Sequence, residues 1–383
     1  MCPVRITSLR SACKTSTDFV HEQIGLILGG GISHFSNRRG WACDNVVSYE
    51  LVTASGIAIN VSATSYTDLY WALRGGGNNY GVVTNFKLVV FAQGEMWGGQ
   101  RIYTEDKFPV VLDAITHFAV TGSAVDPDAA QIVVCSLNLV SHSLYSISDT
   151  LQTFANYPGV GKVAFANLHY AKPMANASVF AAWNNITAID DTTGLRTMGG
   201  MADLLNQGAP VPGAYESWWG ISLKLDRRLL DFVVDTFFTQ VATVADVEQI
   251  FVIMAIQPIT EGEMKAMQKN GGNALGLDPE HGPYFVLNFN PAWIKAEDQD
   301  KFFKVVSDVI DMVKTEAKRR NLDNSFIYLN YASEYQDPIG SYGAANKERL
   351  QNISKKYDPA QVFQYLQPGG FKLVKGAPKS NAI

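Results

Sequence analysis

The sequence predicts an α+β protein in which an antiparallel sheet is covered by helices. Two observations carry this prediction. Apolar runs of strand length recur through the middle of the chain, and segments with helical periodicity separate several of them. Strands that pair locally and are then covered by long helices are typical of an antiparallel sheet with helices on one face. Ahead of them, the first 92 residues read as a compact α+β piece built around glycine turns.

The predicted sheet draws on strand-like runs at 96–104, 130–140, 162–171, 217–226, 248–259 and 283–293. Two helices are predicted from apolar stripes. The segment 226–244 places Leu229, Leu230, Val233, Phe237 and Val241 on one stripe, and 296–320 does the same with Phe302, Val306, Val309, Val313 and Ala317. Basic residues at 318–320 lie at the end of the second helix, as the helix dipole favours.

The first part of the chain contains a predicted hairpin over 46–61, which turns at Ser55-Gly56. A short helix, DLYWALR, follows and ends at Gly75. In the next strand, Val82, Thr84, Phe86, Leu88 and Val90 fall on one face. The last part, 321–383, contains the strand-like run IYLNY and a helix around 346–356.

Composition excludes several classes of protein. With 383 residues, 47% hydrophobic and 17% charged, the chain has the composition of a globular protein of two or three domains. A net charge of -5 gives no electrostatic reason to expect nucleic acid or an anionic membrane as partner. No apolar stretch is long enough to span a bilayer, and the first 20 residues do not resemble a signal peptide. Localisation therefore stays open.

The common nucleotide and metal motifs are absent. Neither GxGxxG nor GxxxxGK[ST] occurs, so a Rossmann or P-loop site has no support. None of the six histidines is spaced from another histidine or a cysteine as metal ligands are, and we predict no metal site.

Two glycine triplets stand out, in LGGGISHFS and in ALRGGGNNYGVVT. Consecutive glycines cost backbone entropy, and folds keep them where the main chain takes positive φ or approaches something closely. The first triplet has two readings: its amides and the Ser33 hydroxyl hold a pyrophosphate in an anion nest, or it is a tight turn in a sheet protein. Glycine content alone favours the turn.

The glycine-rich segments belong to longer motifs that resemble a known family. The runs GGGISHFSNRRGWACDNVVSYELVTASG and DLYWALRGGGNNYGVVTNFKL look like the second lobe of the FAD-binding domain in the p-cresol-methylhydroxylase and vanillyl-alcohol-oxidase superfamily, in its fungal berberine-bridge-like form. The resemblance is weaker in MWGG and LHYAKPMANASVF, and strong again in YLNYASEYQDPIGSYG and KKYDPAQVFQYLQPGGFKL. It therefore extends from Gly25 to Leu373.

The resemblance implies a flavin held between a PCMH-type FAD domain and an α+β substrate domain. The residues that it assigns to the cofactor either contact the flavin or support residues that do. They are Gly29, Gly30, Gly31 and Ser33 at the pyrophosphate, Gly40, Asp44, Asn45 and Val46 in a turn beside the flavin, and Gly81, Val82 and Val83 in a strand whose backbone meets it.

The resemblance also implies that the YxN motif, Tyr328-Leu329-Asn330 followed by Tyr331, is catalytic. In related enzymes a tyrosine near here takes a proton from the substrate hydroxyl while hydride passes to the flavin. Tyrosine has an ordinary pKa near 10, so it acts as a base only where positive charge or hydrogen bonds stabilise the phenolate. Asn330 orients the tyrosine or the substrate in this reading. In the alternative, Tyr328 and Tyr331 are half-buried strand aromatics, and Trp293 and His169 are core or rim residues rather than cavity walls.

The family carries another lobe ahead of the glycine triplet, with an RGGGH-like loop whose histidine bonds to the flavin. No such loop precedes Gly25 here, and neither Cys13 nor His21 has a matching context, so covalent attachment is not supported. We expect a divergent N-terminus over 1–24, the second lobe of a truncated, partial FAD domain over 25–92, a substrate domain over 93–325, and a C-terminal segment over 326–383 that packs back on the FAD domain.

The expected function is FAD-dependent oxidation of a small organic substrate, a secondary metabolite or a sugar-like alcohol, by hydride transfer to flavin, with O2 as the electron acceptor. The alternative is a flavin-free, non-catalytic remnant or fragment that acts at most as a binding module. The absent histidine loop favours the alternative, whereas the intact YxN and glycine motifs favour the enzyme.

Overall fold

The computed structural model describes residues 25–122, 124, 126–137, 161–206, 213–247 and 251–374. The predicted divergent N-terminus over 1–24 lies outside these ranges. The chain divides into two compact units. Among the described residues, unit 1 comprises 25–92, 261–281 and 325–374, and unit 2 comprises 93–260 and 282–324 with the gaps just given. The segment 261–281 thus belongs to unit 1, although the expected substrate domain extended over it.

Unit 1 is a small sheet with short helices. Its antiparallel sheet has the order β2-β1-β3. Its elements are α2 (Ser36–Arg39), η2 (Ala42–Asn45), β1 (Val46–Val52), β2 (Ala58–Ser62), α3 (Thr67–Leu73), β3 (Val82–Leu88), α10 (Glu261–Met267), η9 (Lys269–Gly271), η11 (Leu329–Tyr331), α12 (Pro338–Ser341), α13 (Ala344–Tyr357) and α14 (Val362–Tyr365).

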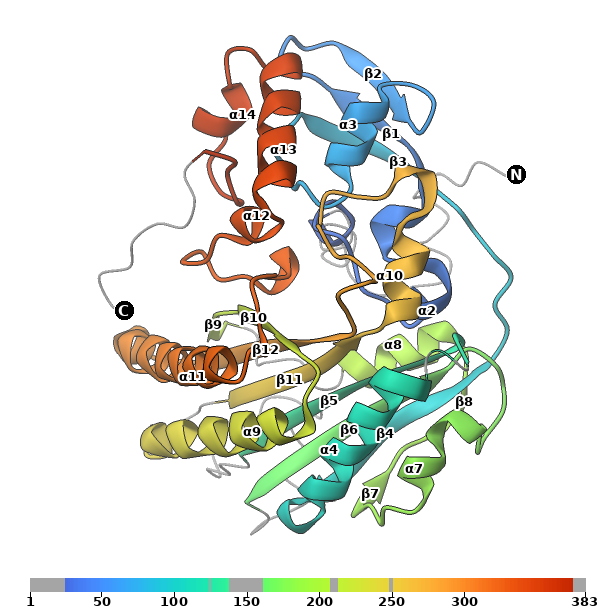
Figure 1. The fold of residues 1–383 in the computed structure, drawn as a ribbon, viewed down its shortest axis with the longest axis vertical. Coiled ribbons are helices and arrows are strands. Elements are labelled where there is room, and N and C mark those ends of the chain that lie inside the picture. The colour runs from blue at the N-terminus through green and yellow to red at the C-terminus, as the bar shows by residue number, and fades with distance from the viewer. Residues whose placement is uncertain are drawn as a thin grey trace. The chain divides into compact units, whose positions relative to one another are not determined.

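Unit 2 is a ten-stranded sheet with helices (Figure 1). The main order is β13-β10-β12-β11-β5-β6-β4-β7, with β8 beside β4 and β9 beside β12. Its elements are β4 (Met96–Thr104), η3 (Glu105–Lys107), α4 (Phe108–His117), η4 (Phe118–Gly122), β5 (Ala129–Leu137), β6 (Lys162–Tyr170), η7 (Ser178–Phe180), α7 (Ala181–Asn184), β7 (Asp190–Asp191), β8 (Gly194–Arg196), α8 (Met198–Asn206), β9 (Tyr215–Glu216), β10 (Trp219–Lys224), α9 (Arg227–Val241), η8 (Ala242–Val244), β11 (Phe251–Ile259), β12 (Tyr284–Trp293), η10 (Ala296–Asp298), α11 (Gln299–Arg319) and β13 (Asp323–Asn324).

The predicted fold class, an antiparallel sheet covered by helices, is confirmed. The strand pairs of unit 2 are antiparallel, and α4, α9 and α11 lie along one face of the sheet (Figure 1). Both predicted helical stripes are buried. Aromatic contacts join the layers, with ring centroids 6.3 Å apart for Phe237 and Phe289 and 5.7 Å apart for Trp219 and Phe303. Burial of these apolar faces drives the packing.

Two local predictions were wrong. The run IYLNY is not a strand, because Leu329–Tyr331 forms a 3-10 turn in which the Tyr331 N–H donates to the Tyr328 carbonyl. In β3, only Phe86 of the five residues assigned to one face is buried. The register between β1 and β3 shifts between Glu50 and Leu51, and such a bulge breaks the alternation on which the assignment depended.

In the parts of the chain that are described, no helix is both long and apolar enough to cross a membrane. The same residues contain no group of three or more His, Cys, Asp or Glu side chains that could hold a metal ion.

Candidate functional site

The first glycine triplet and the YxN motif meet inside unit 1, although almost 300 residues separate them in the sequence. The hydroxyl oxygen of Tyr328 accepts hydrogen bonds from the backbone N–H of Gly31, at 3.0 Å, and of Ile32, at 3.2 Å. Two groups of residues that the sequence analysis assigned to catalysis and to cofactor binding therefore form one cluster. This cluster is the candidate site.

Tyr328 lies at the centre of the cluster and is almost fully buried, with 1% of its surface exposed. Its ring packs edge-on against Trp41 and Tyr331, each with centroids 4.8 Å away. Burial raises the pKa of Tyr328 well above its ordinary value, and the neighbouring Tyr331 adds to this, while the hydrogen bonds from Asn330, Ile32 and Gly31 act to lower it. Burial outweighs the hydrogen bonds, so the neutral phenol is the resting form.

The other two residues of the motif differ in exposure and partners. Asn330 donates from Nδ2 to the Leu26 carbonyl, at 3.0 Å, and to the Tyr328 hydroxyl oxygen, at 2.8 Å. Tyr331 is half-buried, and burial raises its pKa to about 12. Tyr331 therefore has the more accessible ring of the two tyrosines.

The backbone amides of the first triplet already have partners within unit 1. Gly29 and Gly30 donate to the carbonyls of Gly25 and Ile27, and Gly31 donates to Tyr328. The Ser33 N–H donates to the Ser36 hydroxyl, and the exposed Ser33 hydroxyl accepts from Phe35. In this conformation the loop does not present the free N–H groups that an anion nest requires.

The turn residues Gly40, Asp44, Asn45 and Val46 form a corner between α2 and β1. Gly40 ends α2 with φ 69°. The Asp44 carboxylate accepts the Trp41 N–H at 2.9 Å and the Asn273 side-chain amide at 2.9 Å. Asn45 donates to the Arg39 and Trp41 carbonyls, and the carbonyl of Val46 accepts the Tyr70 hydroxyl. These contacts fix the loop that carries Trp41.

A buried ion pair supports this corner, and the sequence analysis did not identify it. Arg74 is fully buried, and its Nη1 lies 4.0 Å from Asp44 Oδ1. The guanidinium also donates to the carbonyls of Lys269 and Asn270. Burial raises the pKa of Asp44 and lowers that of Lys269. The signal that was available is the arginine directly before the second triplet, in ALRGGG.

Gly81 directly precedes β3 and Val82 and Val83 begin it, and β3 is one of the two outer strands of the unit 1 sheet. A Cβ at Gly81 would lie 2.6 Å from the Val52 carbonyl oxygen, so this position must be glycine for β1 and β3 to pair. Val82 is 54% exposed. Within the described residues of unit 1, the outer edge of β3 is unpaired, and its backbone groups are available to a partner.

In unit 2, several polar side chains lie on the sheet face opposite α4, α9 and α11. The strand registers place Gln100, Asn167, His169, Ser136, Asn288 and Ser222 on this face. Trp293 lies on the other face, stacked on Phe302 with centroids 5.3 Å apart, as a core residue would be. Asn288 Oδ1 and Ser222 Oγ are buried, and no described residue offers either atom a hydrogen-bond partner. The sequence analysis did not identify these two residues.

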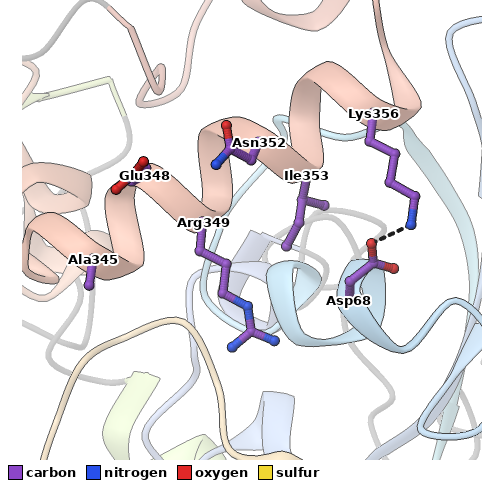
Figure 2. Close-up of a pocket in the computed structure, with 7 residues that line it drawn as sticks. All are labelled: Asp68, Ala345, Glu348, Arg349, Asn352, Ile353 and Lys356. Atoms are coloured by element: carbon purple, nitrogen blue, oxygen red, sulfur yellow. Dashed lines mark hydrogen bonds and ion pairs between the residues drawn. The ribbon is translucent and has the colours of Figure 1, made fainter.

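A separate hollow of about 420 Å³ lies between α3 and α13 in unit 1. Charged and polar side chains line it, and Figure 2 shows Lys356 reaching from α13 to Asp68 on α3. Arg349 stacks on the Trp71 ring, 3.8 Å from its centroid. Two acidic and two basic side chains line the hollow and leave no net charge to select a ligand, so this hollow is a contact between helices rather than a site.

Replacing Asp68 with asparagine is expected to destabilise unit 1 by about 0.5 kcal/mol at pH 7, because the pair with Lys356 is largely exposed and screened. Partial burial acts to raise the pKa of Asp68, but bonds from Lys356, Tyr357 and Leu69 lower it overall. Because the pKa of Asp68 is lower in the folded state than in the unfolded state, its carboxylate stabilises the fold at pH values above the unfolded-state pKa. That stabilisation is lost as the pH falls through the folded-state pKa. Melting temperatures of both proteins from pH 7 to pH 2 check this; a difference that does not shrink in acid would contradict it.

The comparisons with known proteins agree with the resemblance read from the motifs. A family described as berberine and berberine like matches residues 327–368. The FAD-dependent monooxygenase prx3 of Penicillium roqueforti is 31% identical over 363 residues, which cover 91% of this chain and 67% of that protein. The chain belongs to the berberine-bridge-enzyme-like family of FAD-linked oxidoreductases. The FAD-dependent monooxygenase tpcD of Cochliobolus heterostrophus is 36% identical, with coverage of 91% and 66%.

Solved structures of other oxidases share the fold. The carbohydrate oxidase of Microdochium nivale superposes with a TM-score of 0.63 at 20% identity, covering 92% of this chain and 71% of that one. The 6-hydroxy-D-nicotine oxidase of Arthrobacter nicotinovorans gives 0.63 at 18%, covering 89% and 69%. The chain spans about two thirds of the length of the curated relatives that it matches. The α+β fold with a PCMH-type FAD domain is thus confirmed.

Of the residues assigned to FAD, those at the edge of β3 fit a cofactor contact and those of the first glycine triplet do not. The outer edge of β3, at Gly81, Val82 and Val83, offers unpaired backbone, as a strand that meets a cofactor must. The first triplet does not fit as a direct phosphate site in this conformation, because its amides are bonded inside unit 1 and the space beside Gly29 is filled by Asn330. The direct-contact assignments stay predictions.

Proposed function

We propose that this chain takes part in the FAD-dependent oxidation of a small organic substrate. One observation supports this beyond family membership: the YxN segment and the glycine loop form a single hydrogen-bonded cluster, so the residues expected to serve chemistry and cofactor are held together. Bound FAD would accept a hydride from a C–H bond next to oxygen or nitrogen. O2 is proposed to re-oxidise it.

The residues of the chain have separate roles in this proposal. The β3 edge at Gly81, Val82 and Val83 contacts the cofactor through its backbone. Tyr331, the half-buried tyrosine of the cluster, contacts the substrate. Asn330 keeps the cluster in register through its two donated hydrogen bonds. Catalysis by Tyr328 as a base would require its raised pKa to fall on substrate binding.

The polar face of the unit 2 sheet supports a substrate rich in oxygen. Asn288 Oδ1 and Ser222 Oγ are buried polar atoms without a described partner, and leaving such atoms unpaired costs free energy. Neutral amides and hydroxyls pair with hydroxyl or carbonyl groups, and the middle of this face carries no Asp, Glu, Lys or Arg among its described residues. We therefore propose a neutral substrate, a secondary metabolite or a sugar-like alcohol.

A flavin-free binding module is the second candidate. The engaged amides of the glycine loop favour it, because the loop is complete without a phosphate. The visible spectrum of the purified chain separates the two candidates. We expect flavin absorbance that survives gel filtration, either as purified or after addition of FAD. A protein that stays colourless after incubation with excess FAD would contradict the oxidoreductase proposal for this chain.

A further inference from the structure

The hydroxyl oxygen of Tyr328 accepts three N–H donors at once. Two are the consecutive amides of Gly31 and Ile32, at 3.0 and 3.2 Å, and the third is Asn330 Nδ2, at 2.8 Å. A neutral phenol oxygen has two lone pairs, so three N–H donors exceed its acceptor capacity and must share it. Because this oxygen is buried among the three donors, a substrate hydroxyl can reach it only by displacing one of them.

The orientation of the Asn330 amide is fixed by a second contact. Its Nδ2 also lies 3.0 Å from the Leu26 carbonyl oxygen, which only accepts hydrogen bonds. The nitrogen must therefore stand on this side, and its other hydrogen points to Tyr328. Asn330 is consequently a donor to both partners: it ties η11 to Leu26, ahead of the glycine triplet, and to Tyr328, whose oxygen accepts from Gly31 and Ile32.

The first two glycines of the triplet lie so close to neighbouring side chains that a Cβ would not fit. A Cβ at Gly29 would lie 2.0 Å from Asn330 Oδ1 and 2.9 Å from Leu329 Cδ2. A Cβ at Gly30 would lie 2.5 Å from the ring of Trp41, which in turn packs against Tyr328. The absence of side chains at Gly29 and Gly30 thus lets this backbone approach the YxN segment and Trp41 closely.

We propose that Tyr328 and Asn330 are positioning residues that hold the main chain of residues 29–32, and that Tyr328 is not the group that accepts the substrate proton. The part that concerns the substrate rests on the proposed function, whereas the part that concerns the loop does not. Tyr331 is then the tyrosine of the motif that meets the substrate, because it is partly exposed while Tyr328 is buried.

The first test needs no flavin. Hydrogen exchange of the full chain is measured by mass spectrometry for peptides that cover residues 26–35, in wild type and in Tyr328→Phe. Losing one net hydrogen bond raises the equilibrium constant for local opening by a factor of roughly 2 to 10. The hydrogen-exchange rates of the Gly31 and Ile32 amides should therefore rise by about that factor. Tyr365→Phe, at a tyrosine that is 64% exposed, is the matched control and should change nothing in this segment.

Asn330→Ala is the second variant, and it keeps the test decisive if Tyr328→Phe fails to fold. It removes a donor to Tyr328 and the link to Leu26, so exchange should quicken across 26–32. Unchanged exchange in a folded Tyr328→Phe or Asn330→Ala protein would overturn the positioning role.

The second test uses the FAD-loaded chain and follows anaerobic reduction of the flavin by substrate across pH. We expect Tyr328→Phe to keep the wild-type pH profile, and Tyr331→Phe to alter it. A loss of reduction of about 100-fold or more in Tyr328→Phe, with FAD affinity and exchange unchanged, would overturn the proposal, since that is the scale of a lost general base. If the wild-type chain binds no FAD, the proposed function fails, while the exchange test still decides the role in the loop.

Discussion

Replacing Arg74 with methionine is expected to destabilise unit 1 by about 3 to 5 kcal/mol, the range for removing one partner of a buried ion pair. Arg74 is fully buried, and its guanidinium neutralises Asp44 and donates to the Lys269 and Asn270 carbonyls. Methionine fills much of the volume but leaves Asp44 without the guanidinium charge beside it and the two carbonyls without their donor. The measurement is equilibrium unfolding in urea, detected by hydrogen exchange of peptides from residues 40–92. These peptides report the loss of stability for unit 1 alone.

The pH dependence and a surface pair provide the controls. Burial already raises the pKa of Asp44, and loss of the guanidinium raises it further. The cost of the substitution should therefore shrink in acid, where the carboxyl is neutral. Lys356→Met, which breaks the largely exposed pair with Asp68 in the same unit, should cost under about 1 kcal/mol. Equal costs for the two substitutions would contradict the assignment of a buried ion pair.

Much of the fold could be predicted because burial leaves a periodic trace in the sequence. The stripes at Leu229–Val241 and Phe302–Ala317 follow helical spacing, and both are buried in the helices that were expected. The six longer strands of unit 2, β4, β5, β6, β10, β11 and β12, likewise lie where the apolar runs placed them, whereas the short strands β7, β8, β9 and β13 were not predicted. Periodicity was less reliable where the backbone is irregular, as at the β3 bulge and at the turn over residues 329–331.

The candidate site was predicted in its parts but not in its contacts. The motifs identified Tyr328, Asn330 and the glycine triplet separately, but no local pattern shows that a hydroxyl from residue 328 bonds the amides of residues 31 and 32. The same holds for Asn288 and Ser222, whose common face depends on strand pairing across the sheet. Contacts between distant segments are set by tertiary packing, which a single sequence does not state.

Replacing Gly30 with alanine is expected to destabilise unit 1 by about 3 kcal/mol or more. The residue has φ 122°, a conformation that costs a non-glycine residue roughly 1 to 3 kcal/mol. The added Cβ would also lie 2.5 Å from the ring of Trp41, which is fully buried, and overpacking of this kind costs about 1 to 3 kcal/mol. Since Trp41 packs against Tyr328, the variant should also quicken hydrogen exchange across residues 29–32.

Gly56 offers a matched control for this prediction, because it separates backbone strain from steric conflict. It has φ 79°, also in the positive region, but a Cβ there would meet nothing within 4 Å. Gly56→Ala should therefore pay only the backbone cost of about 1 to 2 kcal/mol. The difference between the two variants, measured by the same exchange-detected unfolding, isolates the contact with Trp41. If both variants lose the same free energy of unfolding, glycine is required at position 30 for its backbone angles alone. The close approach to Trp41 would then contribute nothing to the stability of unit 1.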